Sequence, residues 1–104
     1  MKSGLLWKTL KKNFLMVSYL LLITIDVFES LKVIHVTNRR AILAFIYYLA
    51  ENSFDEGDYE TLPDKGGKSF FVKGIRGYIL TYYVDHPAME IKVISLVKNK
   101  KFTF

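Results

Sequence analysis

Apolar residues recur along the chain with two different periods, and these periods predict its secondary structure. Residues 17–25 form an almost unbroken run of Val, Ile, Leu, Tyr and Thr, which is typical of a buried strand. Asp26 follows, with Glu29 three residues later, a variant of the capping box that predicts a short helix ending near His35. The side chains expected to face inward from this helix are Phe28, Leu31 and Ile34.

A second helix is predicted after a short connection, with Thr37 or Asn38 as its N-cap. Its apolar residues recur at helical spacing and form one stripe, whereas Asn52 and Ser53 end the pattern. The members of the stripe are Ala41, Ile42, Phe45, Ile46 and Leu49.

The remainder of the chain alternates in the manner of strands. A polar break over residues 54–67 is followed by predicted strands at residues 69–73, 78–84 and 90–97, which are joined by short turns. In the last strand, Ile91, Val93 and Ser95 are expected on one face, opposite Lys92, Ile94 and Leu96. The predicted class is therefore α+β: an N-terminal strand, a two-helix hairpin and a three-stranded antiparallel meander, forming one four-stranded sheet with the helices on one face.

Charge divides the chain into distinct regions. The 104 residues carry a net charge of +5, of which +4 lies in the first fifteen residues. Residues 51–64 contain six acids and no base, whereas residues 65–101 contain eight bases and two acids. We expect a solvated acidic loop, rather than a pair of catalytic carboxylates, followed by a basic C-terminal half.

The chain offers few groups for metal or covalent chemistry. It has no cysteine, which excludes disulfides, thiolate metal sites and cysteine nucleophiles. His35 and His86 have no second histidine or suitable acid at a ligand spacing, and no glycine-rich phosphate-binding motif is present. We therefore expect neither a metal nor a small-molecule cofactor.

The N-terminal region permits more than one interpretation. Residues 14–25 are uncharged and follow lysines, as in a signal peptide, but twelve residues are short of the roughly 20 that a spanning helix needs. No small-residue cleavage pattern follows them, so a buried strand, a cytoplasmic location and no stable membrane insertion are expected. Residues 1–15 would form a cationic extension, either native or produced by a start codon placed too far upstream, and residues 16–104 the domain.

Basic and aromatic residues are interleaved in the predicted sheet. Such a pattern suits nucleic acid, because cations attract phosphates and aromatic rings stack on unpaired bases. The alternative is that the aromatics fill the core and the lysines keep the sheet soluble. The residues concerned are Lys68, Phe70, Phe71, Lys73, Arg76, Tyr78, Tyr82, Tyr83, Lys92, Lys98, Lys100, Lys101 and Phe102.

Three stretches resemble the helical pair and exit loop of RelE/ParE-type toxins. They are residues 28–31 (FESL), 39–42 (RRAI) and 49–60 (LAENSFDEGDYE). Residues 73–83 and 91–97 resemble the sheet of the same superfamily, in a poorly characterised branch. The resemblance implies a small α+β toxin of a type II toxin–antitoxin system, with a cognate antitoxin as its protein partner.

The resemblance leaves two activities open. RelE-like members cut mRNA on the ribosome without a metal, whereas ParE-like members bind DNA gyrase. For cleavage, Lys73, Arg76 and Lys98 would hold phosphate, and Tyr82 or His86 would transfer protons. Lys68, Lys92, Lys100 and Lys101 would contact the nucleic acid.

Several positions depart from the pattern of the RNA-cutting members. The strand arginine of that pattern falls on Ile79, its C-terminal histidine falls near Val97, and its terminal tyrosine is replaced by Phe102 or Phe104. These departures favour a non-enzymatic binding protein, either a ParE-like or a degenerate member, that acts on a protein target such as DNA gyrase. A small membrane-associated protein is the remaining alternative.

Overall fold

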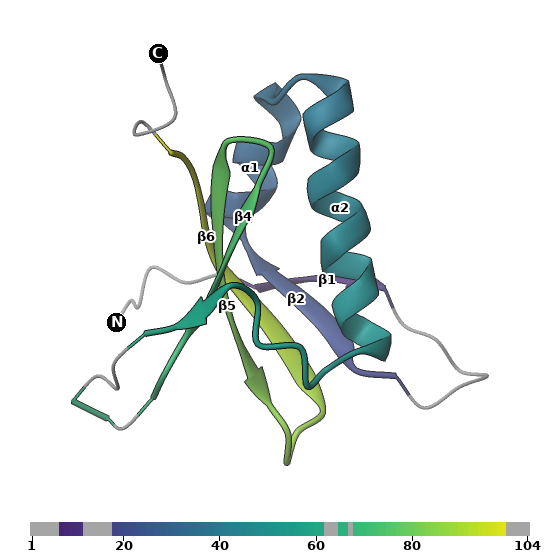
Figure 1. Ribbon diagram of the computed structural model, residues 1–104. Coiled ribbons are helices and arrows are strands. Elements are labelled where there is room, and N and C mark those ends of the chain that lie inside the picture. The colour runs from purple at the N-terminus through teal and green to yellow at the C-terminus, as the bar shows by residue number, and fades with distance from the viewer. Residues whose placement is uncertain (1–6, 12–17, 62–64, 67, 100–104) are drawn as a thin grey trace.

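The chain folds into two helices and one mixed sheet. The computed structural model describes residues 7–11, 18–61, 65–66 and 68–99, with the backbone alone for residues 8–11. In chain order its elements (Figure 1) are β1 (Trp7–Lys11), β2 (Leu20–Thr24), α1 (Ile25–Val33), α2 (Val36–Glu51), β3 (Tyr59–Glu60), β4 (Phe71–Ile75), β5 (Tyr78–Asp85) and β6 (Glu90–Lys98).

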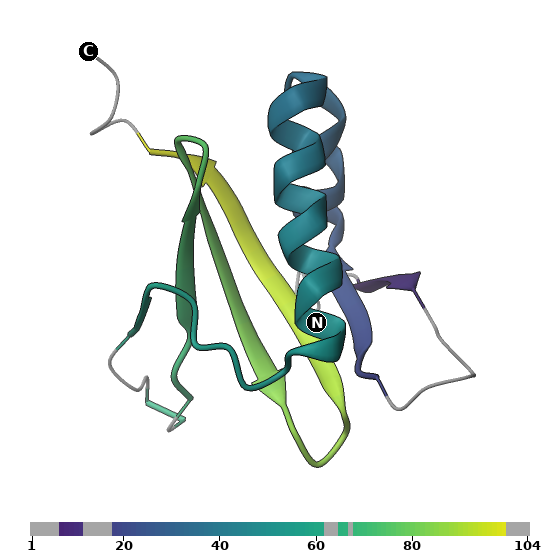
Figure 2. The same cartoon turned by 45° about the vertical axis from the view of Figure 1, so that its right-hand side comes forward.

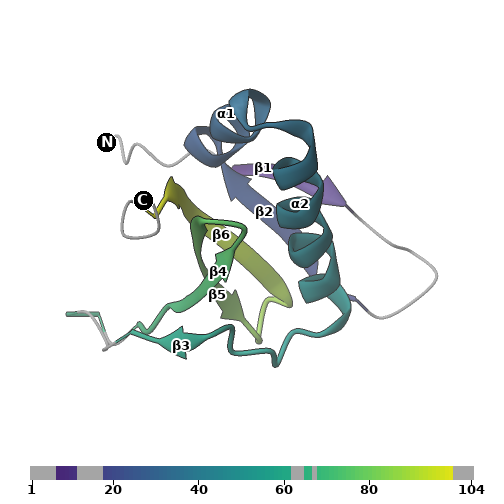
Figure 3. The ribbon, with the colours of Figure 1, turned by 45° about the horizontal axis from the view of Figure 1, so that its top comes forward.

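The sheet has six strands in the order β1-β2-β6-β5-β4-β3. Strands β2 and β6 are parallel, and every other neighbouring pair is antiparallel. The predicted α+β class and the antiparallel meander β4-β5-β6 are therefore confirmed, but the predicted total of four strands is wrong. Strands β1 and β3 extend the sheet at its two opposite edges (Figure 3).

The sequences of the two additional strands, β1 and β3, show no pattern that predicts a strand. Strand β1 lies within residues 1–15, where lysines suggest a solvated tail, yet it pairs with β2 in a register that sets Trp7 opposite Thr24. Strand β3 has only two residues, too few for any alternation of polar and apolar side chains to be visible. The predicted boundary between residues 15 and 16 falls outside the described residues.

Both helices begin earlier than the sequence indicates, because their caps are not the predicted ones. The Thr24 hydroxyl accepts a hydrogen bond from the Val27 N–H, so Thr24 caps α1, and Asp26 lies in the first turn instead. The His35 ring nitrogen accepts from the Thr37 N–H at the start of α2. No helix among the described residues combines the length and the apolar character needed to cross a membrane.

The core lies between the helices and one face of the sheet (Figure 2). From α2, the predicted stripe residues Ile42, Ile46 and Leu49 are fully buried, as are Leu80 and Tyr82 of β5. The other core residues are Leu21, Ile23, Val27, Leu31, Ile34, Ala50, Ile91, Val93 and Leu96.

An irregularity in the pairing of β5 with β6 reverses the predicted alternation of β6. Thr81 lies opposite Ser95, whereas the next residue, Tyr82, lies opposite Val93, so β6 has one extra residue at this point. Beyond it Leu96, rather than Ser95, faces the core. The bulge thus keeps large apolar side chains inside from Ile91 to Leu96.

Candidate nucleic-acid interface

The face of the sheet that turns away from the helices carries a cluster of cations and aromatic rings. Side chains alternate between faces along a strand, so Tyr83 points away from the core that holds Tyr82. Lys92 lies directly opposite Tyr83 on β6 and shares this face. We call the cluster the cation–aromatic face and define it as Trp7, Lys68, Phe70, Tyr83 and Lys92.

Tyr83 stands at the centre of the cation–aromatic face. The ammonium of Lys92 donates to its hydroxyl at 3.3 Å, and that of Lys68 does so at 3.5 Å. Lys68 also lies 4.9 Å from the centre of the Tyr83 ring, and Phe70 meets that ring edge to face. The Lys92 ammonium lies 5.5 Å from the centre of the Trp7 ring. Two cations and three rings are therefore held together on one surface.

A groove of about 560 Å³ opens beside this cluster, at the end of the sheet where β5 turns into β6. Its lining includes Lys68, Tyr83, Asp85, His86 and Lys92. The two ammonium groups outnumber the Asp85 carboxylate and are suited to a phosphate, and the histidine ring adds nitrogen atoms that can form hydrogen bonds.

Lys92 keeps its charge although it is partly buried. Burial alone would lower the pKa of its ammonium, but hydrogen bonds to Tyr83 and Glu90 outweigh burial and raise the pKa above its ordinary value. The Glu90 carboxylate lies 3.5 Å from the Lys92 ammonium. Lys92 is therefore a fixed cation rather than a group that exchanges protons near neutral pH.

The residues predicted to hold phosphate for catalysis lie on the other side of the sheet. Lys73 is opposite Leu80, and Lys98 is opposite Tyr78, so both share the helix-facing side. The Lys73 ammonium lies 3.3 Å from a carboxylate oxygen of Asp58. The two predicted groups of lysines are thus separated by the sheet itself.

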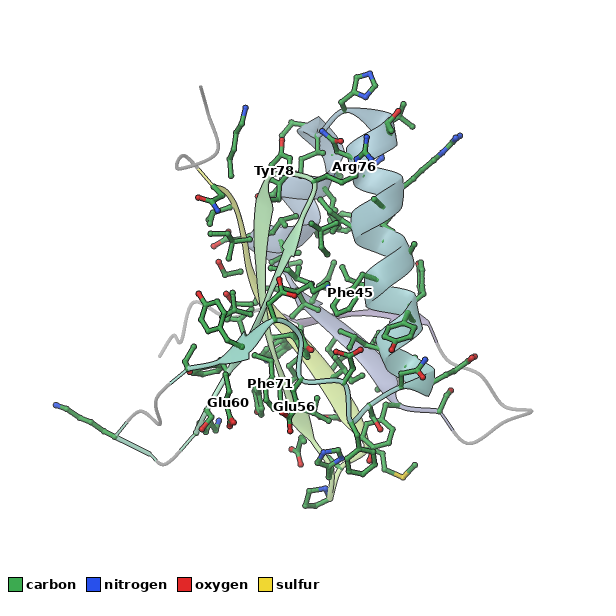
Figure 4. The ribbon with its side chains drawn as sticks, in the orientation of Figure 1. Phe45, Glu56, Glu60, Phe71, Arg76 and Tyr78 are labelled. Carbon is green, nitrogen blue, oxygen red and sulfur yellow. The ribbon has the colours of Figure 1, made fainter. Side chains whose placement is uncertain are left out.

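Arg76 and His86 lie at opposite ends of β5. Arg76 is in the β4-β5 turn, where its Nε donates to the Asn38 side chain of α2 at 2.9 Å, and Figure 4 shows it at the helix-hairpin end. His86 follows the last residue of β5, an eight-residue strand whose ends are roughly 25 Å apart at the usual rise per residue. Arg76 and His86 therefore do not belong to one site.

Tyr82 is a core residue. It is fully buried, and its hydroxyl donates to the backbone carbonyl of Asp55 at 2.9 Å. Burial, followed by the nearby charges of Asp55 and Asp58, raises the pKa of its hydroxyl well above the ordinary value. It packs against Phe45 and Phe71 and anchors the loop that leaves α2, so a role in proton transfer has no support from its position.

Two acids of the predicted solvated loop have a structural role. Asp55 accepts hydrogen bonds from the Tyr48 hydroxyl and the Gly57 N–H, both at 2.8 Å. Asp58 accepts from the Gly74 N–H at 2.7 Å, and this bond is the main reason that its pKa is lowered. Glu56 and Glu60, by contrast, are exposed and lie far from Arg76 in Figure 4.

The structure thus regroups the predicted residues. It brings Lys68, Lys92 and His86 to one groove and separates Lys73, Arg76, Tyr82 and Lys98 from it. Lys100 and Lys101 lie outside the described residues. Among the described residues, no three metal-binding side chains gather at one point.

Sequence reasoning missed one part of this face altogether. Trp7 belongs to a stretch whose lysines suggest a tail, and only its pairing with β2 places it near Lys92. The indole of Trp7 among lysines was the one feature that could have indicated a strand here, but a single side chain does not establish the alternation of polar and apolar residues that predicts a strand.

Comparison with known proteins adds no relative: no protein-family model, curated protein or solved structure matches this chain.

Proposed function

We propose that this chain is a toxin-like protein of the RelE/ParE type that binds single-stranded RNA on the cation–aromatic face and does not cut it. The observation that carries the proposal is the convergence of Lys68 and Lys92 on the Tyr83 hydroxyl, beside a groove large enough for a nucleotide. Ammonium groups fixed in this way attract phosphate oxygens, and rings on either side offer surfaces for bases.

Single-stranded RNA suits this surface better than a duplex does. Aromatic rings can stack only on bases that are unpaired and turned outward. Trp7 lies beside Lys92, Lys92 contacts Tyr83, and Tyr83 contacts Phe70, so an RNA strand lying across the face would meet a ring, a cation and two further rings in turn.

The dispersal of the predicted catalytic residues favours binding without cleavage. Attack by a 2′-hydroxyl needs a proton acceptor and a stabilising cation at the same phosphate. His86 lines the groove, but its Nδ1 lies 2.8 Å from the Tyr19 hydroxyl and its ring stacks on Phe54. The ring is thus held by two other side chains.

The test is a binding experiment combined with analysis of the RNA. Fluorescence anisotropy of a labelled 12-nucleotide RNA should show saturable binding at low salt, at least tenfold tighter than binding to a duplex of the same sequence. The RNA should be intact after incubation with the protein, both alone and in a translating extract.

Three other results would redirect the proposal. Discrete cuts in the RNA would replace binding by cleavage, and their loss in His86→Ala would assign the proton transfer. Arrest of gyrase supercoiling without RNA binding would favour the ParE-like activity. Equal affinity for single strands and duplexes would remove the role of the aromatic rings.

A further inference from the structure

A second hollow lies at the C-terminal end of α2, next to the groove but of opposite character. It encloses about 510 Å³, and three aromatic residues, Tyr19, Tyr48 and Phe54, contribute to its lining. Glu51 and Asp55 line it as well, and among the residues that the structure describes no lysine, arginine or histidine does. We call it the aromatic–acidic pocket.

The walls of this pocket are fixed by hydrogen bonds. The Tyr19 N–H donates to the Ala50 carbonyl at 2.8 Å, which holds the chain before β2 against the end of α2. The Tyr48 hydroxyl donates to the Asp55 carboxylate at 2.8 Å. The pocket is therefore formed before any ligand arrives, which lowers the entropic cost of binding.

Two rings of the pocket are more exposed than large apolar side chains usually are. Phe54 is 79% exposed and Tyr48 is 44% exposed. One face of the Phe54 ring stacks on His86, with ring centres 4.4 Å apart. Phe54 thus connects the two hollows: it lines the aromatic–acidic pocket, and it stacks on His86, which lines the groove.

The electrostatic character of the pocket is negative. Its two carboxylates come from the stretch of residues 51–64, which has six acids and no base. The hydrogen bond to Asp55, aided by burial and by the charge of that carboxylate, raises the pKa of the Tyr48 hydroxyl. A carboxylate has about four lone-pair sites, so Asp55 can accept a further donor in addition to Tyr48 and Gly57.

We propose that the aromatic–acidic pocket binds an arginine side chain of a partner polypeptide. Charge complementarity and ring geometry select this occupant. A guanidinium is planar, so it can stack on an exposed ring such as Phe54 while it donates to a carboxylate such as Glu51. A lysine ammonium would gain the charge interaction but not the planar stacking.

The test is a titration of the full chain with a short probe peptide, acetyl-Gly-Arg-Gly-amide, in which two-dimensional amide NMR spectra monitor binding. The expected result is saturable shifts at Tyr19, Ser53 and Phe54 in the millimolar range. A peptide with citrulline in place of arginine has nearly the same shape but no charge, and it should bind at least fivefold more weakly. Equal binding of the two peptides, or shifts elsewhere on the protein, would overturn the proposal.

Two substitutions locate the site, and each has a matched control. Phe54→Ala should weaken binding about two- to fivefold through loss of stacking, while Tyr59→Ala, at another exposed ring, should not. Glu51→Gln should weaken binding up to about fivefold, whereas Glu29→Gln on α1 should leave it unchanged. Both test positions are exposed, so the variants should keep the fold. If both variants bind the peptide like the parent protein, the proposal is wrong.

Discussion

Replacing Lys68 and Lys92 together by glutamine should weaken binding to single-stranded RNA about 25-fold at 0.1 M salt. This 25-fold factor follows from counterion release, because each phosphate contact on a single strand contributes a slope of about 0.7 in log affinity against log salt. Two lost contacts therefore correspond to roughly a factor of five each. Glutamine is an uncharged side chain that still carries hydrogen-bond donors, so the change removes charge while it keeps both positions polar.

The same double variant should also respond less to salt. Its salt slope should fall by about 1.4, the contribution of two phosphates. A double variant at Lys32 and Lys98 loses the same charge away from the cation–aromatic face, since Lys32 is on α1 and Lys98 is on the helix-facing side. Equal loss of affinity in the two double variants would mean that net charge, and not this face, governs binding.

The largest effect on stability is expected from Gly57→Ala, which should lower the free energy of unfolding by about 3 kcal/mol. Gly57 has a φ of +66°, where a side chain is strained. A Cβ there would also lie 2.8 Å from the Val72 carbonyl oxygen. That oxygen accepts the Asp58 N–H at 2.7 Å, so it cannot retreat without breaking a bond that holds the loop.

Gly77→Ala is the matched control for Gly57→Ala. Gly77 has a φ of +83° in the β4-β5 turn, but a Cβ there would meet nothing within 4 Å. Backbone strain alone should cost about 1 kcal/mol. Urea unfolding of both variants measures the difference between their free energies of unfolding. An equal loss of stability in the two variants would show that the contact with the Val72 carbonyl does not contribute. Domains of this size are stable by only about 5–15 kcal/mol, so the larger loss is readily measured.

The parts of the fold with a clear period could be predicted from the sequence. The stripe of α2 and the meander β4-β5-β6 are examples, because their patterns repeat over several turns or residues. Strand β1 could not be predicted in this way, since its lysines favour a solvated stretch and its conformation depends on pairing with β2. The cap of α2 could not either, because a histidine ring replaces the expected threonine or asparagine.

The candidate site was harder to predict because it depends on the registers in which the strands pair, and these cannot be read from the sequence. Lys68 and Lys92 are separated by β4 and β5, and they meet only through the pairing that sets Tyr83 opposite Lys92. The bulge in β6 further changes which residues share a face. The basic and aromatic composition predicted a nucleic-acid surface, but it could not assign each lysine to one side of the sheet.

The emission of Trp7 tests the central claim most directly. Trp7 is the only tryptophan of the chain, is 38% exposed and lies beside Lys92, so its fluorescence reports on the cation–aromatic face alone. Titration with a single-stranded RNA should quench this emission along the same curve as the anisotropy, because bases stack on the indole. RNA binding that saturates in anisotropy while the Trp7 emission stays constant would contradict the proposed site.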